Sequence, residues 1–284
     1  MLPREHGAWA MLLIPYLVGT IVAGWGGWTS FLLLLCVLLL FSGSRPLEVA
    51  LQGSARPLRG VGADLKPALE GNYSNETIER RRRALTRLAA YLGLGSVAGI
   101  LLLVPFHRWA LVVMGIVAGV ALAAQLPLKR WRWDRSWPAR LLSIAALSAT
   151  GPAAYYAASG LLDRRAAAVW VLSFLYSGAS VFYVRLIFQP PARLKQRALG
   201  ELRAEAGRQM AGYLGIALLA LGILTALGWM PPLAPVVLLP TAVKAAWAWL
   251  RPKYRPTLKE AGLAEIGHSG LFALLAVAAV VVWS

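Results

Sequence analysis

The chain alternates between long apolar stretches and short polar connections, and the apolar stretches are long enough to cross a bilayer as helices. Lys, Arg, Asp and Glu are scarce inside these stretches and concentrate between them. We therefore predict an all-α polytopic membrane protein with nine transmembrane helices, forming one integral membrane domain over residues 1–284. The predicted helices cover residues 8–25, 30–47, 85–104, 109–126, 137–159, 166–187, 210–227, 233–250 and 263–283.

The basic residues indicate how this bundle is oriented. When the nine helices are threaded in order, all 29 Lys and Arg residues except Arg108, Arg164 and Arg165 fall on one side. Cytoplasmic loops of membrane proteins carry the excess of Lys and Arg. The pattern predicts a multi-pass protein of the cell membrane with a cytoplasmic N-terminus and an external C-terminus.

The formal net charge of +17 has a simple explanation in this topology. Hydrophobic residues make up 58% of the chain and charged residues 14%, well below the proportion in soluble domains. The bases therefore act as topology signals and as partners for anionic headgroups, above all in the run at residues 80–83. We expect the lipid bilayer, with its anionic headgroups, to be a partner, and we expect no nucleic acid.

The predicted cytoplasmic connections are long, whereas the external ones are short turns, so a site is expected to open to the cytoplasm. Residues 48–84 contain several Gly and Pro residues, and Asn75 is predicted to cap the third helix. After Pro190 and Pro191, the residues Leu194, Leu199, Leu202 and Ala206 predict a short amphipathic helix at the membrane interface.

Polar residues in the sixth predicted helix form a stripe at three- and four-residue spacing, which is typical of a face turned toward a bundle. Such a stripe either makes hydrogen bonds between helices or lines a cavity. Both interpretations stay open. The stripe consists of Ser173, Tyr176, Ser177, Ser180 and Tyr183.

Ionisable residues near the cytoplasmic face form the candidate ligand-binding site. Lys244 lies about 10 Å below the end of the eighth helix, at 1.5 Å per residue, and either extends to the surface or binds an anion in a cavity. Glu265 and His268 are three residues apart and share one side of the ninth helix. The predicted binding residues are Arg4, Glu5, His6, Arg45, Glu48, Ser177, Arg185, Lys244, Glu265 and His268.

A mononuclear metal site is one use of Glu5, His6, Glu265 and His268. The bundle motif for a carboxylate-bridged metal pair needs two Glu-x-x-His copies and further Glu ligands, and this chain has one copy. We therefore favour a hydrogen-bonded or salt-bridged cap on the helix ends over a metal. The sequence identifies no cofactor and no catalytic residue.

Three segments carry a specific resemblance: residues 2–13 (LPREHGAWAMLL), 42–47 (SGSRPL) and 265–269 (EIGHS). With these segments the chain resembles the YwiC-like family of bacterial integral membrane proteins, which implies a bacterial cell membrane. The resemblance runs over nearly the whole chain and implies no activity.

A weaker resemblance is to the UbiA superfamily of intramembrane prenyltransferases, carried by residues 125–130 (QLPLKR) and a following helix with Gly151 and Pro152. It implies a nine-helix bundle, an internal N-terminus and a cytoplasmic site near the loops after helices two and six. Those enzymes hold magnesium diphosphate with two Asp-rich motifs. This chain has only Asp64, Asp134 and Asp163, and none of them forms either motif.

Three function classes remain at this stage. The first is a UbiA-like bundle with a cytoplasm-facing polar cavity that binds or processes an amphipathic, isoprenoid or quinone-like ligand. If it is an enzyme, it is a transferase without the Asp-rich magnesium motifs. The alternatives are a transporter of a small anion or metabolite, and a noncatalytic accessory subunit of a membrane complex.

Overall fold

The computed structural model describes residues 6–52, 66–124, 137–188, 196–251 and 256–283. These residues form α-helices joined by short connections. The helices are α1 (His6–Val22), α2 (Trp28–Gln52), α3 (Lys66–Leu103), α4 (Ala110–Ala123), α6 (Trp137–Ser148), α7 (Thr150–Ser159), α8 (Arg164–Ile187), α9 (Gln196–Ala226), α10 (Ala234–Leu250) and α11 (Leu258–Val282).

The predicted all-α class is confirmed, and each predicted apolar segment coincides with helix in the described residues. The fifth segment is shared by α6 and α7, which are separated at Ala149. By length and composition, five helical stretches can cross a membrane, and four shorter helices are also apolar. The chain is therefore a membrane protein, while the count of nine spans stays a prediction. The five stretches are Arg81–Leu103, Ala139–Ser159, Arg164–Ile187, Gly200–Ala226 and Lys259–Val282.

Three predicted boundaries are wrong. Helix α2 continues through Pro46 to Gln52, and α3 already begins at Lys66, so the connection between them is shorter than residues 48–84. Asn75 consequently lies inside α3 and does not cap it. The amphipathic segment is helical from Gln196 onward, but it is the first part of α9 and not a separate helix.

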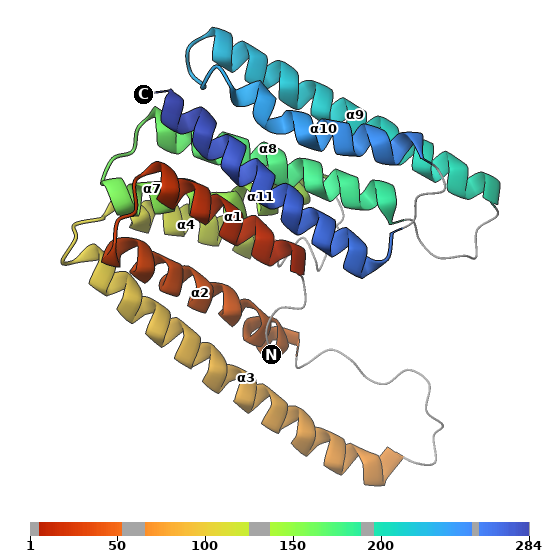
Figure 1. The fold of residues 1–284 in the computed structure, drawn as a ribbon. Coiled ribbons are helices and arrows are strands. Elements are labelled where there is room, and N and C mark those ends of the chain that lie inside the picture. The colour runs from red at the N-terminus through yellow and green to blue at the C-terminus, as the bar shows by residue number, and fades with distance from the viewer. Residues whose placement is uncertain (1–5, 53–65, 125–136, 189–195, 252–255, 284) are drawn as a thin grey trace. The chain divides into compact units, whose positions relative to one another are not determined.

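The contacts divide the chain into two compact units. The hairpin unit contains residues 31–107, with α3 and most of α2 lying side by side (Figure 1). A Cβ atom at Gly95 would lie 3.2 Å from Leu40, and one at Gly99 would lie 3.8 Å from Cys36. These two glycines are four residues apart on one face of α3, and they allow α2 and α3 to approach closely.

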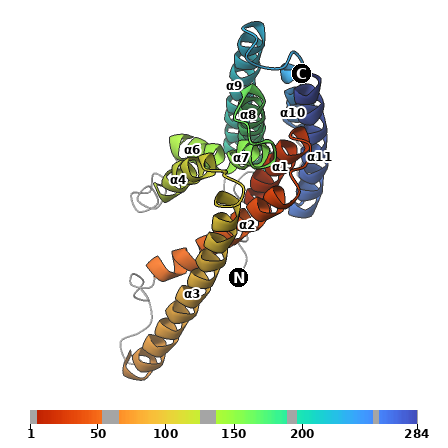
Figure 2. The ribbon, with the colours of Figure 1, turned by 90° about the vertical axis from the view of Figure 1, so that its left-hand side faces the viewer.

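The bundle unit contains residues 7–30 and 108–284, and α8 is its central helix. Helix α8 contacts α6, α7, α9, α10 and α11, and two views show α10 and α11 running beside it (Figures 1 and 2). Its side chains Val169 and Leu172 are fully buried together with Leu221, Leu238 and Phe272. The core of the bundle unit therefore surrounds α8.

Helices α1 and α7 approach closely within the same unit. A Cβ atom at Gly19 would lie 2.0 Å from the carbonyl oxygen of Gly151, so only glycine fits there. The Thr150 hydroxyl also donates to the Leu12 carbonyl at 2.8 Å. Lipid is as apolar as the side chains of these helices, so the hydrophobic effect does not drive membrane helices together. Close packing at small residues and hydrogen bonds between helices do so instead.

Candidate functional site

The polar stripe of α8 faces the interior of the bundle unit, as its spacing predicted. Ser173, Tyr176, Ser177 and Tyr183 are buried, and Ser180 is partly buried. Helices α10 and α11 both pack on α8, and they bring charged side chains to this stripe.

Lys244 of α10 and Glu265 of α11 form the central contact of the site. The Lys244 ammonium donates to Glu265 Oε1 at 2.6 Å, and the two side chains are 7% and 23% exposed. A lone charged residue at the centre of a membrane helix costs about 2.5–3.5 kcal/mol, so a buried lysine needs a partner. Glu265 supplies the opposite charge across the helix interface.

Side chains of α8 complete the surroundings of this ion pair. The Lys244 Nζ atom lies 4.1 Å from the centre of the Tyr183 ring, within the range of a cation–π contact. The Ser180 hydroxyl donates to Glu265 Oε2 at 3.4 Å, a long hydrogen bond. The ammonium and the carboxylate are thus each contacted by a second group.

A second polar contact lies next to the ion pair. The hydroxyl groups of Tyr176 and Ser269 are 3.1 Å apart, and the Tyr176 ring stacks on Phe272 with ring centres 4.0 Å apart. His268 is partly buried and interacts electrostatically with Lys244 and Glu265. We call the whole set the Lys244 cluster: Tyr176, Ser180, Tyr183, Lys244, Glu265, His268 and Ser269.

The structure brings together three of the ten predicted binding residues: Lys244, Glu265 and His268. Ser177 is buried on the same face of α8. Arg185 donates to the Gln209 side chain at 2.8 Å, a contact between α8 and α9.

The structure describes no side chains for the other five predicted residues. Arg4 and Glu5 lie outside the described residues, and His6 begins α1 with its side chain undescribed. Arg45 and Glu48 lie on α2 in the hairpin unit, again without described side chains. Their membership in one site with Lys244 stays a prediction.

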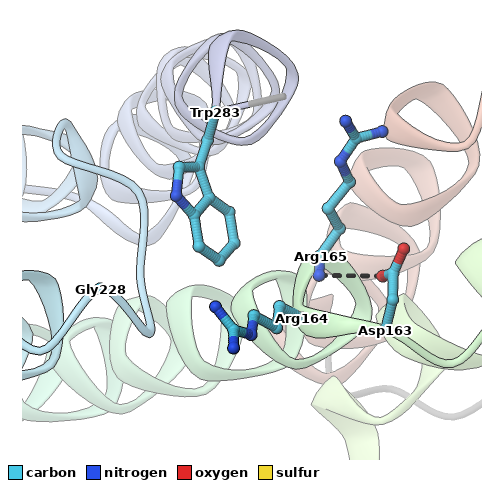
Figure 3. Close-up of a pocket in the computed structure, with 5 residues that line it drawn as sticks. All are labelled: Asp163, Arg164, Arg165, Gly228 and Trp283. Atoms are coloured by element: carbon cyan, nitrogen blue, oxygen red, sulfur yellow. Dashed lines mark hydrogen bonds between the residues drawn. The ribbon is translucent and has the colours of Figure 1, made fainter.

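Sequence reasoning missed Ser269 as a site residue. Its signal was available, because Ser269 follows Glu265 by four positions and therefore shares its helix face. A pocket with a volume of about 340 Å³ at the beginning of α8 was also missed, and none of the residues that line it belongs to the Lys244 cluster (Figure 3).

The cluster can hold charge and exchange hydrogen bonds, but it offers few metal ligands. Among the described side chains, no group of three His, Cys, Asp or Glu residues is placed to hold a metal ion. The contact of Glu265 with Lys244 is a salt bridge between α10 and α11.

Comparison with known proteins gives the family. A family model described as YwiC-like protein matches residues 2–155, which is more than half of the 284 residues. No curated protein and no solved structure matches the chain. On the strength of the match from α1 through most of α7, the chain belongs to the YwiC-like protein family.

Proposed function

We propose that this membrane protein binds the polar head of an amphipathic ligand at the Lys244 cluster. The 2.6 Å contact between Lys244 and Glu265, held between three helices, is the observation that carries the proposal. Buried ionisable groups in membrane helices are expensive, and they are retained mainly where they bind or move something.

The ammonium of Lys244 retains hydrogen-bonding capacity beside this contact. An ammonium has three N–H donors, and among the described residues Glu265 accepts one while the Tyr183 ring covers another side. A ligand oxygen that accepts from the ammonium can therefore bind without displacing Glu265. The hydroxyls of Tyr176 and Ser269 offer a further donor nearby.

The charge balance favours an uncharged head over a diphosphate. Lys244 and Glu265 together are neutral, and a polyanion would meet the Glu265 carboxylate directly beside the only ammonium of the cluster. An uncharged carbonyl group needs only hydrogen-bond donors from the cluster, and a hydroxyl group needs donors and one acceptor. A quinone-like head therefore fits the cluster better than an isoprenoid diphosphate.

The surroundings on α11 favour a ligand that arrives from the bilayer. Ile266 is 69% exposed and Leu271 is 43% exposed, and they flank the face that carries Glu265 and His268. An apolar tail can lie along these side chains while the head reaches the partly exposed Glu265. This arrangement supports an amphipathic ligand more than a freely soluble one.

The proposal places the Lys244 end of the bundle unit at the cytoplasmic face of a bacterial cell membrane. The asymmetric distribution of Lys and Arg supports this orientation. A nine-span, UbiA-like bundle with a polar cavity that opens at this end is part of the same proposal. Prenyl transfer by the magnesium diphosphate route is not, because the Asp-rich motifs are missing.

Ligand binding by the full-length protein in mild detergent tests the proposal. The probes are decylubiquinone and farnesyl diphosphate, and binding is measured by quenching of tryptophan fluorescence and by native mass spectrometry. We expect the quinone to bind, and Lys244→Met to weaken it about tenfold because a charged hydrogen bond is lost. Lys259→Met is the matched control, since Lys259 is exposed at the start of α11.

Equal quinone affinity in the Lys244→Met variant and the unchanged protein would remove the cluster as the binding site. Tighter binding of farnesyl diphosphate than of the quinone would show that the neutral-head argument is wrong. Equal losses in the Lys244 and Lys259 variants would indicate a general charge effect at the surface.

Transport of a small anion or metabolite is the second candidate, and Ser173 favours it. Its hydroxyl is fully buried on α8 and has no hydrogen-bond partner among the described residues. Ser173 precedes the cluster residues of α8 and lies on the side of the cluster toward the beginning of that helix. A polar path that continues past the cluster is what transport requires. Efflux from proteoliposomes that depends on Lys244 would select this candidate over simple binding.

A further inference from the structure

The pocket at the beginning of α8 lies far from the Lys244 cluster in the same unit. It has a volume of about 340 Å³ and is lined by Asp163, Arg164, Arg165, Gly228 and Trp283. Nineteen residues of α8 separate Arg164 from Tyr183 of the cluster, or about 28 Å along the helix axis. The pocket is therefore a separate site at the opposite end of α8.

Two connections of the bundle unit and the end of its last helix meet at this pocket. The α7–α8 connection supplies Asp163, the turn after α9 supplies Gly228, and the end of α11 supplies Trp283. Figure 3 shows the Trp283 ring pointing from α11 toward α8, and the Arg164 guanidinium pointing from α8 toward the same space. A volume of this size is at the lower end of the range for small-ligand sites.

The side chains that line the pocket carry a net positive charge, because they include two arginines and one aspartate. The Asp163 carboxylate is already engaged: Oδ1 accepts from the backbone N–H of Arg165 at 2.9 Å and of Ala166 at 3.2 Å. Its Oδ2 accepts from the Tyr155 hydroxyl at 2.9 Å. The carboxylate thus acts as the N-cap of α8 and holds the rim of the pocket in place.

Arg164 is the exposed cation of the pocket, while Arg165 also interacts with the Tyr155 side chain. A guanidinium presents several donors in a planar fork that matches the oxygens of a phosphate group. The indole N–H of Trp283 is a further donor, because tryptophan carries no acceptor. These groups favour a phosphate over a cation or an apolar ligand.

The position along the helices indicates where such a phosphate comes from. Trp283 ends α11, and Trp229 beside Gly228 is 67% exposed. Tryptophans at helix ends mark the interface between hydrocarbon and water, which is the depth of lipid headgroups. We propose that this pocket binds the phosphate group of a membrane lipid headgroup.

Native mass spectrometry of the full-length protein in mild detergent tests this proposal. The probes are phosphatidylglycerol and a diacylglycerol with the same acyl chains, which lacks the phosphate. We expect phosphatidylglycerol to bind at least tenfold more tightly, and Arg164→Gln to remove about tenfold of that affinity. Trp283→Phe keeps the ring, removes the N–H donor and is expected to lose several-fold.

Arg251→Gln is the matched control, because the Arg251 guanidinium lies 4.5 Å from the centre of the Trp247 ring, but Arg251 does not line this pocket. It should bind phosphatidylglycerol like the unchanged protein, and so should Lys244→Met, which separates this proposal from the quinone site. Displacement of the lipid by millimolar inorganic phosphate would identify free phosphate as the occupant. Equal binding of both lipids, or equal losses in the Arg164 and Arg251 variants, would overturn the proposal.

Discussion

Glu265→Gln removes the negative charge from the ion pair with Lys244 while it keeps an oxygen within reach of the ammonium. The Lys244 side chain is 7% exposed, so its charge then has little access to water. Breaking a buried ion pair by removing one partner costs about 3–5 kcal/mol. Tyr183, 4.1 Å from Nζ, retains part of the stabilisation, and we expect a loss near the lower limit, about 3 kcal/mol.

Lys244→Met should cost less, because the charge that it strands is more accessible. The Glu265 side chain is 23% exposed and can recover hydration or take up a proton, so we expect a loss of about 1–2 kcal/mol. The double variant Lys244→Met/Glu265→Gln leaves neither charge buried. It should be more stable than Glu265→Gln alone, since the two changes act on one contact and do not add.

Thermal unfolding of the full-length protein in mild detergent measures these differences, with the fluorescence of its 12 Trp residues as the signal. At roughly 2 °C per kcal/mol for a chain of this size, the unfolding midpoint should fall by about 6 °C in Glu265→Gln. In Lys244→Met it should fall by about 2–4 °C.

An exposed ion pair in the same chain provides the control. Arg83 donates to Glu79 one helical turn earlier, and these side chains are 72% and 66% exposed. Surface pairs contribute about 0–1 kcal/mol, so Arg83→Gln should shift the midpoint by less than about 2 °C. A fall in the double variant that equals the sum of the two single changes would refute the reasoning, because it would mean that the buried charges are not coupled.

Two further predictions concern the packing of the bundle unit, and both use the same unfolding assay. Gly19→Ala should lower the midpoint, at a cost of about 1–3 kcal/mol, because its Cβ atom would lie 2.0 Å from the Gly151 carbonyl oxygen. Gly222→Ala meets nothing within 4 Å and should leave the midpoint unchanged or raise it. Asp163→Ala should cost about 1–2 kcal/mol through loss of the cap of α8 and of the Tyr155 contact, and Asp163→Ser should recover part of it.

The existence and type of the helices could be predicted because apolar length alone determines them. A chain segment that enters a bilayer must satisfy its own backbone hydrogen bonds, and a helix does this locally. No knowledge of the neighbours is needed for that step. The predicted segments therefore coincide with helices, from α1 at the start of the chain to α11 at its end.

The ends of α3 and α9 could not be predicted in the same way. A helix that leaves the bilayer can continue with polar residues. The hydropathy of the sequence then does not show where that helix ends. Pro67 does not mark a connection, because it lies in the first turn of α3, where a missing N–H donor costs little. Asn75 is a good cap residue, but the free-energy cost of placing an asparagine inside a helix is too small to end α3 there.

The pairing of Lys244 with Glu265 was the hardest feature to predict. The sequence placed both residues near one membrane face. However, α10 and α11 are apolar on most sides, so the sequence pattern does not show which side of each helix faces its neighbours. Only the packing of both helices on α8 defines which faces meet. The stripe on α8 was the exception, because its hydroxyl groups mark the buried side directly.

The family match and the Lys244 cluster occupy different parts of the chain. The match ends at residue 155, within α7, whereas the cluster is built from α8, α10 and α11. Membership in the family therefore does not by itself assign the cluster to its other members. The ion pair does constrain them, because a relative that lost only one partner would strand the other charge. Loss of the lysine alone would cost about 1–2 kcal/mol, and loss of the glutamate alone about 3 kcal/mol. We expect relatives that extend through α11 to keep both charges or to replace both together, and a relative that keeps one buried charge alone would contradict the role assigned to the pair.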